Sequence, residues 1–252
     1  MLEQVKQQQS AYEGIYSPEQ ISSFDFHITS DPLTRYLRDR RLIKSLEVLK
    51  KYNNDILNWN ILISCGGVGG EGIFFKKKGF KSVTVSDISD NSLKICNLFD
   101  PEISTIMLNG ESLDIPDNSY DLVVVQDGLH HLPRPVSGFT EMLRVAKKGI
   151  VVIEPYDSFI GNLIGTEWEV QGDAVNYVFR WNKRMVTQTV KSMMLKDYKL
   201  IKVLRFWDHS LAVSKIVNKL PKSLQYKAAK IIYGLLKPFD IFGNMMVSVV
   251  LK

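Results

Sequence analysis

Short apolar runs alternate with amphipathic stretches through the middle of the chain. Five runs have the length and β-branched content of buried strands, at residues 61–63, 83–85, 103–108, 120–125 and 150–153. Three stretches between them have helical spacing, at residues 71–78, 90–99 and 136–147. Because strands and helices alternate, this pattern predicts an α/β fold with a doubly wound, Rossmann-like and mostly parallel sheet.

The flanking regions predict further elements. Asp31 and Pro32 are typical of a helix start, and the apolar stripe that follows predicts a helix to about residue 51. Its basic side chains are expected on a solvated face: Arg35, Arg38, Arg40, Arg41 and Lys44. Residues 1–10 are polar and predict a frayed tail, whereas the aromatic residues 11–30 should pack against the domain.

The pattern changes after residue 155. Residues 156–179 are irregular and aromatic, residues 182–195 predict a helix, and residues 199–206 and 244–251 predict two strands, the last one antiparallel. We therefore expect three parts: an N-terminal helical cap (1–55), a cofactor-binding core (56–155), and the C-terminal part of the sheet (156–252).

The C-terminal part contains a lysine-rich helical insertion at about residues 209–239. This segment has six lysines and no acid, with apolar residues at helical spacing and a break near Pro221. One interpretation is a solvated outer face on a cap that covers the substrate. The other is contact with anionic membrane lipid or with a phosphate-bearing substrate.

Composition and charge narrow the classes of function. The chain has 252 residues, 45% of them hydrophobic, which suits one large α/β domain with additions. Its net charge of +5 is too small to imply nucleic acid. Only two cysteines, Cys65 and Cys96, argue against a disulfide framework. The polar start and the lack of an apolar run of about 20 residues predict a cytoplasmic protein, with peripheral membrane contact left open.

The most informative chemical pattern follows the first predicted strand. The glycine-rich loop at residues 66–72 gives way to a helix, so free backbone N–H groups can meet the polar atoms of a ligand. Asp87 ends the second strand about 20 residues after Gly67, where a carboxylate can accept hydrogen bonds from ribose hydroxyls. This arrangement predicts a nucleotide-binding βαβ unit, and the alternative is a glycine turn that binds nothing.

Polar residues follow the other predicted strands. The carboxyl ends of parallel strands meet at one edge of the sheet, which brings together Asp87, Asn109, Gln126, His130 and Glu154. Neutral histidine is suited to general base catalysis, so His130 and His131 are candidate catalytic residues, and helix capping or packing is the alternative. Tyr12, Tyr16 and His27 are expected to form an N-terminal lid or to dock on the domain. Neither His27 nor His209 has ligand spacing to the pair at His130, so no metal site is predicted.

Residues 61–155 resemble the class I S-adenosylmethionine-dependent methyltransferase family, in its small-molecule branch. Residues 61–69 are similar to the first motif of that family, and Asp87 matches its ribose-binding acid. Residues 109–123 and the Leu129-His130-His131-Leu132 element resemble later motifs. The most specific resemblance is to the family's helix before the fifth strand. Several different residue types match that motif in the same order in Glu141-Met142-Leu143-Arg144-Val145-Ala146-Lys147-Lys148-Gly149.

The resemblance implies S-adenosyl-L-methionine as cofactor, S-adenosyl-L-homocysteine as product, and O- or N-methylation of a small-molecule, glycan or lipid-linked acceptor. The implied cofactor-binding residues are Cys65, Gly66, Gly67, Gly69, Glu71, Asp87, Ile88, Asn109, Gly110, Glu111 and Gln126. The expected substrate contacts come from Tyr12, Tyr16, His130 and Glu154.

Three positions depart from the family pattern. Cys65 replaces the first glycine of the loop, Ile63 stands where an acid usually precedes it, and Asn109 stands where the family has Asp. Glu71 is an alternative anchor for the cofactor. Two other functions stay open: an NAD(P)-dependent oxidoreductase, because residues 67–72 match G-x-G-x-x-G, and a catalytically inactive methyltransferase fold that acts as a partner protein. The sequence leaves the acceptor and the oligomeric state undetermined.

Overall fold

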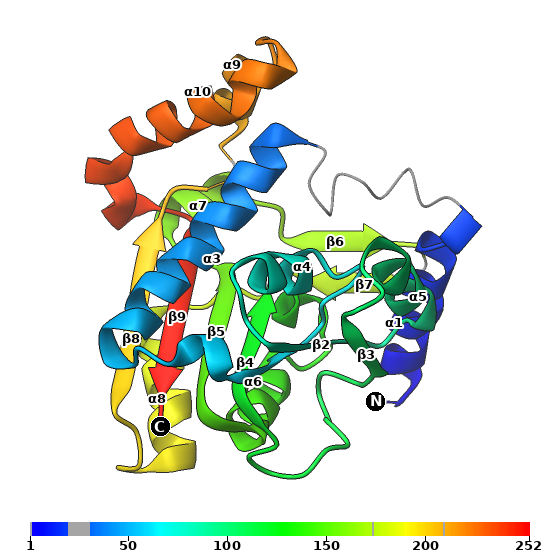
Figure 1. Cartoon of the computed structure of the whole chain (residues 1–252). Coiled ribbons are helices and arrows are strands. Elements are labelled where there is room, and N and C mark those ends of the chain that lie inside the picture. Colours follow the sequence, from blue (N-terminus) through cyan, green and yellow to red (C-terminus); the bar gives the residue numbers. More distant parts are fainter. Residues whose placement is uncertain (1, 20–30, 173, 209) are drawn as a thin grey trace.

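A computed structural model covers the chain and describes residues 2–19, 31–172, 174–208 and 210–252 (Figure 1). The expectations for His27 and His209, and for packing of the aromatic residues between positions 20 and 30, lie outside the described residues.

A seven-stranded sheet forms the centre of the molecule, in the order β3-β2-β1-β4-β5-β9-β8. β1 to β5 are parallel, and β9 is antiparallel to both of its neighbours, β5 and β8. The predicted α/β fold with an antiparallel last strand is therefore confirmed. The strands are β1 (Asn60–Ile63), β2 (Ser82–Asp87), β3 (Ser104–Met107), β4 (Tyr120–Gln126), β5 (Ala146–Pro155), β8 (Leu200–Phe206) and β9 (Met245–Leu251).

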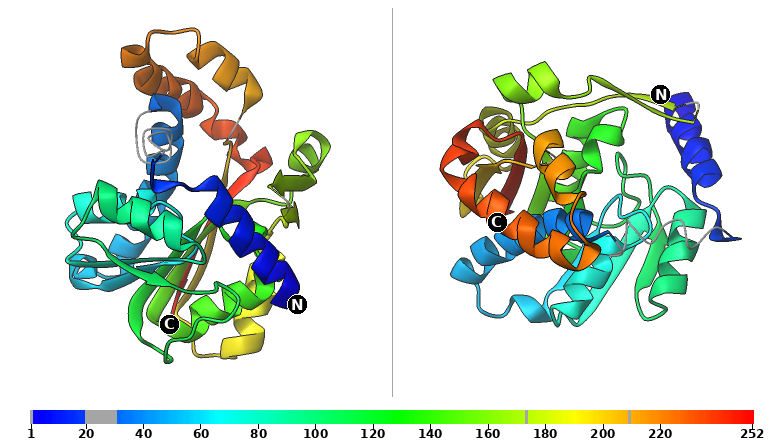
Figure 2. Two further views of the ribbon diagram at one scale, coloured as in Figure 1. Left: turned by 90° about the vertical axis from the view of Figure 1, so that its right-hand side faces the viewer. Right: turned by 90° about the horizontal axis from the view of Figure 1, so that it is seen from above.

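Helices cover both faces of this sheet (Figure 2). One hydrophobic core lies between the sheet and α3 (Pro32–Tyr52), α4 (Gly70–Lys77) and α5 (Asp90–Phe99). The other core lies between the sheet and α6 (Pro135–Val145) and α8 (Lys183–Met194). Short connections run through η2 (Ile56–Asn58), η3 (Leu129–His131) and α7 (Phe159–Ile164).

The prediction of a frayed tail at residues 1–10 is wrong for residues 2–10, because these belong to α1 (Leu2–Ile15), which Figure 2 shows on the outside of the domain. The helix forms because hydrogen bonds to distant parts of the chain hold it. Gln8 Nε2 donates to Asn176 Oδ1 at 2.7 Å, and the Glu13 carboxylate accepts from the amides of Asp90 and Asn91 at the start of α5, at 2.6 and 3.0 Å. These bonds hold a polar helix whose own sequence gives it no apolar face to bury.

The irregular region after residue 155 also contains regular structure. β6 (Trp168–Gln171) and β7 (Ala174–Tyr177) form an antiparallel hairpin outside the main sheet. In its register Glu169 lies opposite Asn176, the residue that binds Gln8 of α1. The hairpin and α1 therefore hold each other in place.

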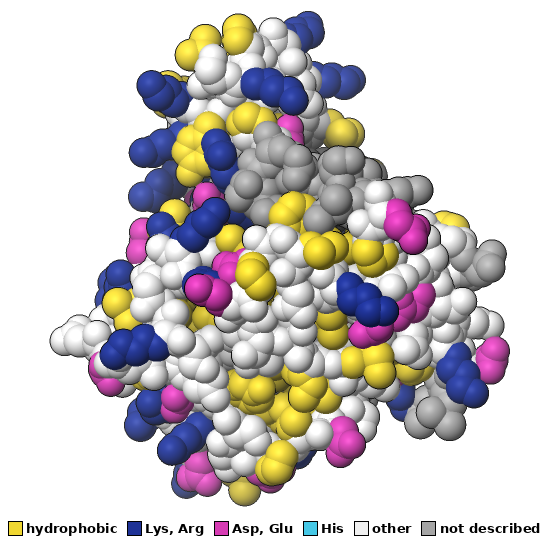
Figure 3. All heavy atoms as spheres, turned by 45° about the vertical axis from the view of Figure 1, so that its right-hand side comes forward, with side chains coloured by type: hydrophobic (Ala, Val, Ile, Leu, Met, Phe, Trp, Pro, Cys, Tyr) yellow, Lys and Arg dark blue, Asp and Glu magenta, His cyan; other side chains and the backbone are white. Residues whose placement is uncertain are grey.

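The lysine-rich insertion folds as α9 (Leu211–Val217), α10 (Lys222–Leu235) and η4 (Lys237–Phe242), with Pro221 between the two α-helices. Its buried residues Val213, Val217, Ala229 and Tyr233 pack against the first turns of α3. Figure 3 shows the outer surface of this projection at the top of the view, where Lys and Arg side chains surround hydrophobic ones. No helix within the described ranges is both long and apolar enough to cross a membrane. The division of the chain at residues 55 and 155 stays a prediction.

Candidate active site

A cavity of about 390 Å³ lies at the carboxyl ends of β1, β2 and β4, between α1 and α3. Its volume is in the range of small-molecule and cofactor sites. The cavity brings together many of the predicted site residues: Tyr12, Tyr16, Cys65, Gly66, Gly67, Glu71, Asp87, Ile88, Gly110, Gln126 and His131. α3 contributes four lining residues that the sequence analysis did not assign to the site: Thr34, Leu37, Arg38 and Arg41.

The glycine loop and Asp87 meet directly in this cavity. Asp87 Oδ2 accepts from the Gly67 amide at 2.8 Å, and its Oδ1 accepts from the Ser89 amide at 3.0 Å. Burial raises the pKa of Asp87, and these backbone N–H groups oppose that rise by stabilising the carboxylate. Gly67 has a left-handed backbone, with φ +49°, and a Cβ placed on it would meet nothing within 4 Å. The loop is therefore open to a ligand at Gly67.

Cys65 occupies a left-handed conformation, with φ 52°, which glycine adopts at much lower cost. The left-handed backbone explains why the resembling family has glycine at this position. The volume of the Cys65 side chain is accommodated by two glycines, since a Cβ on Gly110 would lie 2.8 Å from its Sγ and a Cβ on Gly128 would lie 2.7 Å from its Cβ. Burial, with Asp87 nearby, raises the pKa of the Cys65 thiol to about 12, so the thiol is neutral at pH 7.

Glu71 and Gln126 form a second polar pair in the cavity wall. Gln126 Nε2 donates to Glu71 Oε1 at 3.0 Å. Burial raises the pKa of Glu71, and the charge of Arg38 opposes this. Gln126 Oε1 is buried and accepts no hydrogen bond from any described residue, so the cavity offers an unused acceptor to a ligand.

Arg41 is the largest departure from the expected solvated face of α3, because its side chain is only 2% exposed. Its Nε and Nη2 donate to the two carboxylate oxygens of Asp208 at 3.0 and 2.9 Å, and its Nη1 also pairs with Asp127. Asp208 follows β8 and Asp127 follows β4, so the guanidinium ties α3 to two strand ends. Burial alone would lower the pKa of Arg41, but the charges of Asp127 and Asp208 outweigh burial and raise the pKa above its usual value.

Of the two candidate catalytic histidines, only His131 lines the cavity. His130 is buried behind it, and its Nδ1 lies 2.6 Å from Glu154 Oε2. Glu154 Oε1 also accepts from the amides of Gly128 and Leu129, at 2.9 and 2.7 Å, which holds η3 in place. Glu154 is fully buried and does not line the cavity. The contacts of His130 and Glu154 with substrate therefore stay predictions.

The two imidazoles have opposite electrostatic environments. Burial alone would lower the pKa of His130, but the Glu154 carboxylate outweighs it and raises the pKa to about 9. Burial and the neighbouring charge of His130 lower the pKa of His131 to about 3. At pH 7, His131 is thus the neutral imidazole of the pair.

Three predicted cofactor residues have structural partners and do not line the cavity. Asn109 Oδ1 accepts from the Glu111 amide at 3.0 Å, and the Glu111 carboxylate pairs with Arg134, whose Nε lies 3.0 Å away. A Cβ on Gly69 would lie 2.2 Å from Cys96 Sγ, so glycine is required there for packing of the loop on α5. Cofactor contacts by Asn109, Glu111 and Gly69 stay predictions.

Comparison with known proteins shows which proteins the core is similar to. Residues 63–153 match the family model described as a methyltransferase domain. Demethylmenaquinone methyltransferase from Staphylococcus epidermidis is 32% identical over 99 residues, which are 38% of this chain and 37% of that protein. A ubiquinone/menaquinone biosynthesis C-methyltransferase from Shewanella pealeana is 32% identical over 80 residues, 29% and 32% of the two chains. The matches thus span about a third of the length of these relatives.

Solved structures extend the likeness over most of the fold. A putative sarcosine dimethylglycine methyltransferase from Galdieria sulphuraria superposes with a TM-score of 0.58 at 15% identity and covers 85% of each chain. Magnesium protoporphyrin IX methyltransferase from Synechocystis, solved with bound SAH, gives a TM-score of 0.55 at 11% identity over 87% of this chain and 86% of that one. Residues 63–153 thus match a methyltransferase domain, and the chain has the fold of S-adenosylmethionine-dependent methyltransferases.

Proposed function

We propose that this protein transfers a methyl group from S-adenosylmethionine to a small-molecule acceptor. The observation that carries the proposal is the joint position of Asp87 and the open backbone of Gly67 in one cavity at the carboxyl edge of the sheet. In open α/β sheets this edge is where ligands bind, and a carboxylate beside a glycine loop suits a ribose.

The residues of the cavity fit an adenosyl cofactor. Asp87 has carboxylate lone pairs beyond those that Gly67 and Ser89 use, and these can accept from the ribose hydroxyls. The unused Gln126 Oε1 and the Glu71 carboxylate can accept from amino groups of the ligand. Bound S-adenosylmethionine supplies an activated methyl group on a sulfonium, which leaves the protein the task of positioning an acceptor. His131 lies in the cavity wall, and a role for it as general base stays a prediction.

A titration tests this function against its main alternative. Isothermal calorimetry should show one S-adenosylhomocysteine bound per chain and no heat of binding from NAD⁺ or NADP⁺ under the same conditions. Binding of a nicotinamide dinucleotide alone would support the oxidoreductase interpretation. Binding of neither ligand would favour the inactive partner protein.

The position of the lysine-rich insertion supports a proposal for the class of acceptor. Leu37 of α3 lines the cavity and also packs in the cluster that holds α9 and α10. The outer surface of α9, α10 and η4 exposes large apolar side chains: Leu211, Ile216, Leu224, Ile231, Leu235 and Phe239. Lysines are interspersed with them at positions 215, 219, 222, 227, 230 and 237, all exposed.

Exposed apolar side chains among lysines suit the surface of an anionic bilayer, where the apolar groups enter the headgroup region and each lysine contributes about 1 kcal/mol. We therefore propose that the acceptor is an amphiphilic molecule carried by such a membrane, and that the insertion docks on it. The names of the quinone-modifying relatives are consistent with a lipid-soluble acceptor.

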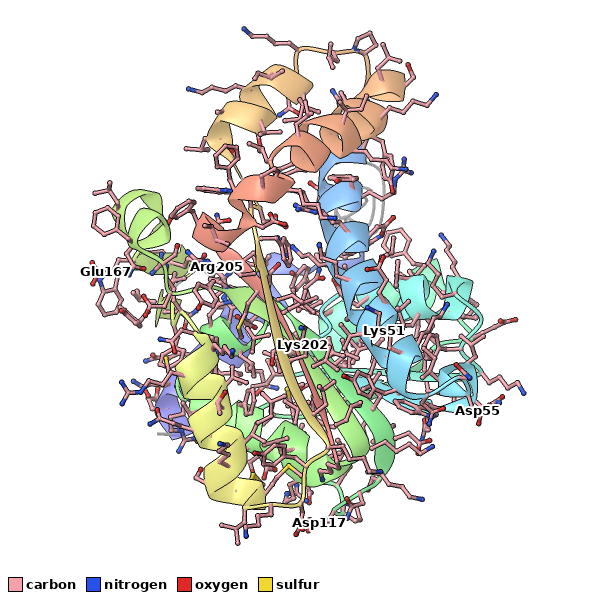
Figure 4. The ribbon with its side chains drawn as sticks, turned by 90° about the vertical axis from the view of Figure 1, so that its left-hand side faces the viewer. Lys51, Asp55, Asp117, Glu167, Lys202 and Arg205 are labelled. Atoms are coloured by element: carbon pink, nitrogen blue, oxygen red, sulfur yellow. The ribbon has the colours of Figure 1, made fainter. Side chains whose placement is uncertain are left out.

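Vesicle sedimentation tests the membrane contact. The protein should bind vesicles that contain phosphatidylserine and stay in the supernatant with phosphatidylcholine alone. The variant K227E/K230E should bind the anionic vesicles at least about tenfold more weakly, because two attractive charges become repulsive. The matched control is K51E/K202E, since Figure 4 labels these two lysines on α3 and β8, outside the insertion, and both are exposed. Equal loss in the two variants, or equal binding to neutral vesicles, would contradict the proposal.

A further inference from the structure

The β6–β7 hairpin brings a third ligand-type side chain to the histidine pair. Glu169 Oε2 of β6 lies 3.5 Å from His131 Nδ1 and 3.9 Å from His130 Nε2. The three groups can each offer one atom, and these atoms all lie within 4.8 Å of one another. Sequence spacing does not show this cluster, because Glu169 reaches the pair only through the fold of the hairpin.

His130 is oriented as a metal ligand would be. Its Nδ1 lies 2.6 Å from the buried Glu154 carboxylate, so the Nε2 is the ring nitrogen left for another partner. A carboxylate on the second nitrogen is the usual support of a metal-bound histidine, because it fixes the tautomer and the ring orientation. Glu154 is itself held by the amides of Gly128 and Leu129, so the ring has little freedom to turn.

His131 supplies an independent observation. Its Nδ1 is buried and makes no hydrogen bond with any residue of the described ranges. The backbone around it is fixed, since the His131 carbonyl accepts from Gln8 Nε2 of α1, and the Tyr12 ring meets the imidazole edge-on with centroids 6.1 Å apart. A buried ring nitrogen that makes no hydrogen bond is costly unless a ligand satisfies it.

We propose that His130 Nε2, His131 Nδ1 and the Glu169 carboxylate bind one divalent transition-metal ion. Two imidazoles and one carboxylate form a donor set that suits Zn²⁺ or Fe²⁺ and is a poor site for Mg²⁺, which prefers oxygen. Two ligands on one ion can lie up to about 4.2 Å apart, twice a bond of about 2.1 Å. The distances from Glu169 are within this limit, and the two imidazole nitrogens lie within 4.8 Å of each other, so a small rotation of the His131 side chain brings them within it as well.

At this position a bound ion has two effects, one on the hairpin and one on the cavity. Binding ties the β6–β7 hairpin to η3, next to the bonds that Gln8 makes from α1, so the ion stabilises the position of the hairpin and of α1 beside the cavity. Because His131 lines the cavity, an ion on its Nδ1 also lies at the cavity wall, where an open coordination position can take an oxygen of the acceptor. Only this second consequence rests on the proposed methyl transfer.

Metal titration of the full chain without cofactor tests the site. The protein, stripped with chelator, should bind one Zn²⁺ per chain, and Co²⁺ should give visible d–d absorption that Zn²⁺ displaces, whereas Mg²⁺ should neither bind nor compete. E169Q and H131Q should each weaken Zn²⁺ binding at least 100-fold, because each removes one of three ligands. E167Q is the matched control, since Glu167 precedes the hairpin and is exposed, and Figure 4 labels it outside the sheet.

The outcomes separate the metal site from the proposed function. Metal-free E169Q should melt at the temperature of the metal-free parent protein, which shows that the substitution leaves the fold intact, and it should keep its affinity for S-adenosylhomocysteine. Zn²⁺ should raise the melting temperature of the parent protein and of E167Q but not that of E169Q. Zn²⁺ affinity in E169Q equal to that of the parent protein, or an equal loss in E167Q, would overturn the assignment whatever the protein methylates.

Discussion

Replacing Asp87 by alanine is expected to weaken S-adenosylhomocysteine binding by at least about 100-fold. The variant loses the carboxylate that accepts from the ribose hydroxyls, and hydrogen bonds to a charged group contribute about 1.5–3 kcal/mol each. Two such bonds correspond to a factor of 100 or more, since about 1.4 kcal/mol is tenfold in affinity. The Gly67 amide also loses its 2.8 Å partner, so the loop is less well organised for the ligand. Calorimetric titration measures the change.

Two further variants distinguish ligand binding from a damaged fold. Asp90 lies three residues along the chain, is exposed, and pairs with Lys94 at 2.6 Å, so D90A should leave the affinity within about twofold. D87N keeps an oxygen that can accept from Gly67 and should give an intermediate affinity. Unchanged affinity in a folded D87A variant would remove the ribose role of Asp87 and with it the main support of the proposed function.

Local sequence is sufficient to predict which residues of consecutive elements meet in the cavity. Gly67 and Asp87 belong to one βαβ unit, whose spacing fixes where the loop and the second strand end, and the structure joins them by a hydrogen bond. The position of Gln126 was predictable for the same reason, because β4 is a central strand whose carboxyl end must lie at the same edge. Topology rules act on such short-range patterns.

The residues that the sequence analysis missed have partners far away in the chain. In the sequence Gln8 belongs to a polar segment with no sign of a partner. In the structure it donates to Asn176 Oδ1 and to the His131 carbonyl. Glu169 belongs to a segment without clear periodicity, and only the hairpin turns it toward the histidines. A single sequence carries no signal for such contacts, because they depend on how separate elements pack and not on local propensity.

Partners far away in the chain also explain why the expected solvated face of α3 is wrong for Arg41. The lysines and arginines of this helix have similar sequence context, yet Lys51 is exposed and Arg41 is buried between Asp127 and Asp208. The two aspartates lie 86 and 167 positions away. The charge of Arg41 therefore joins three elements at the cavity wall, which the spacing within α3 does not show.

Replacing Arg41 by methionine is accordingly expected to lower the free energy of unfolding by about 3–5 kcal/mol, because it leaves the fully buried Asp208 carboxylate without its bidentate partner. For a domain of this size the melting temperature should fall on the order of 10 °C. K51M is the control on the same helix, where an exposed charge should change melting by no more than about 2 °C. R41M/D208L should recover much of the loss, since removing both members of a buried pair costs less than removing one. Melting of R41M within 2 °C of the parent protein, measured without ligand, would show that the buried pair does not stabilise the junction of α3 with the strand ends.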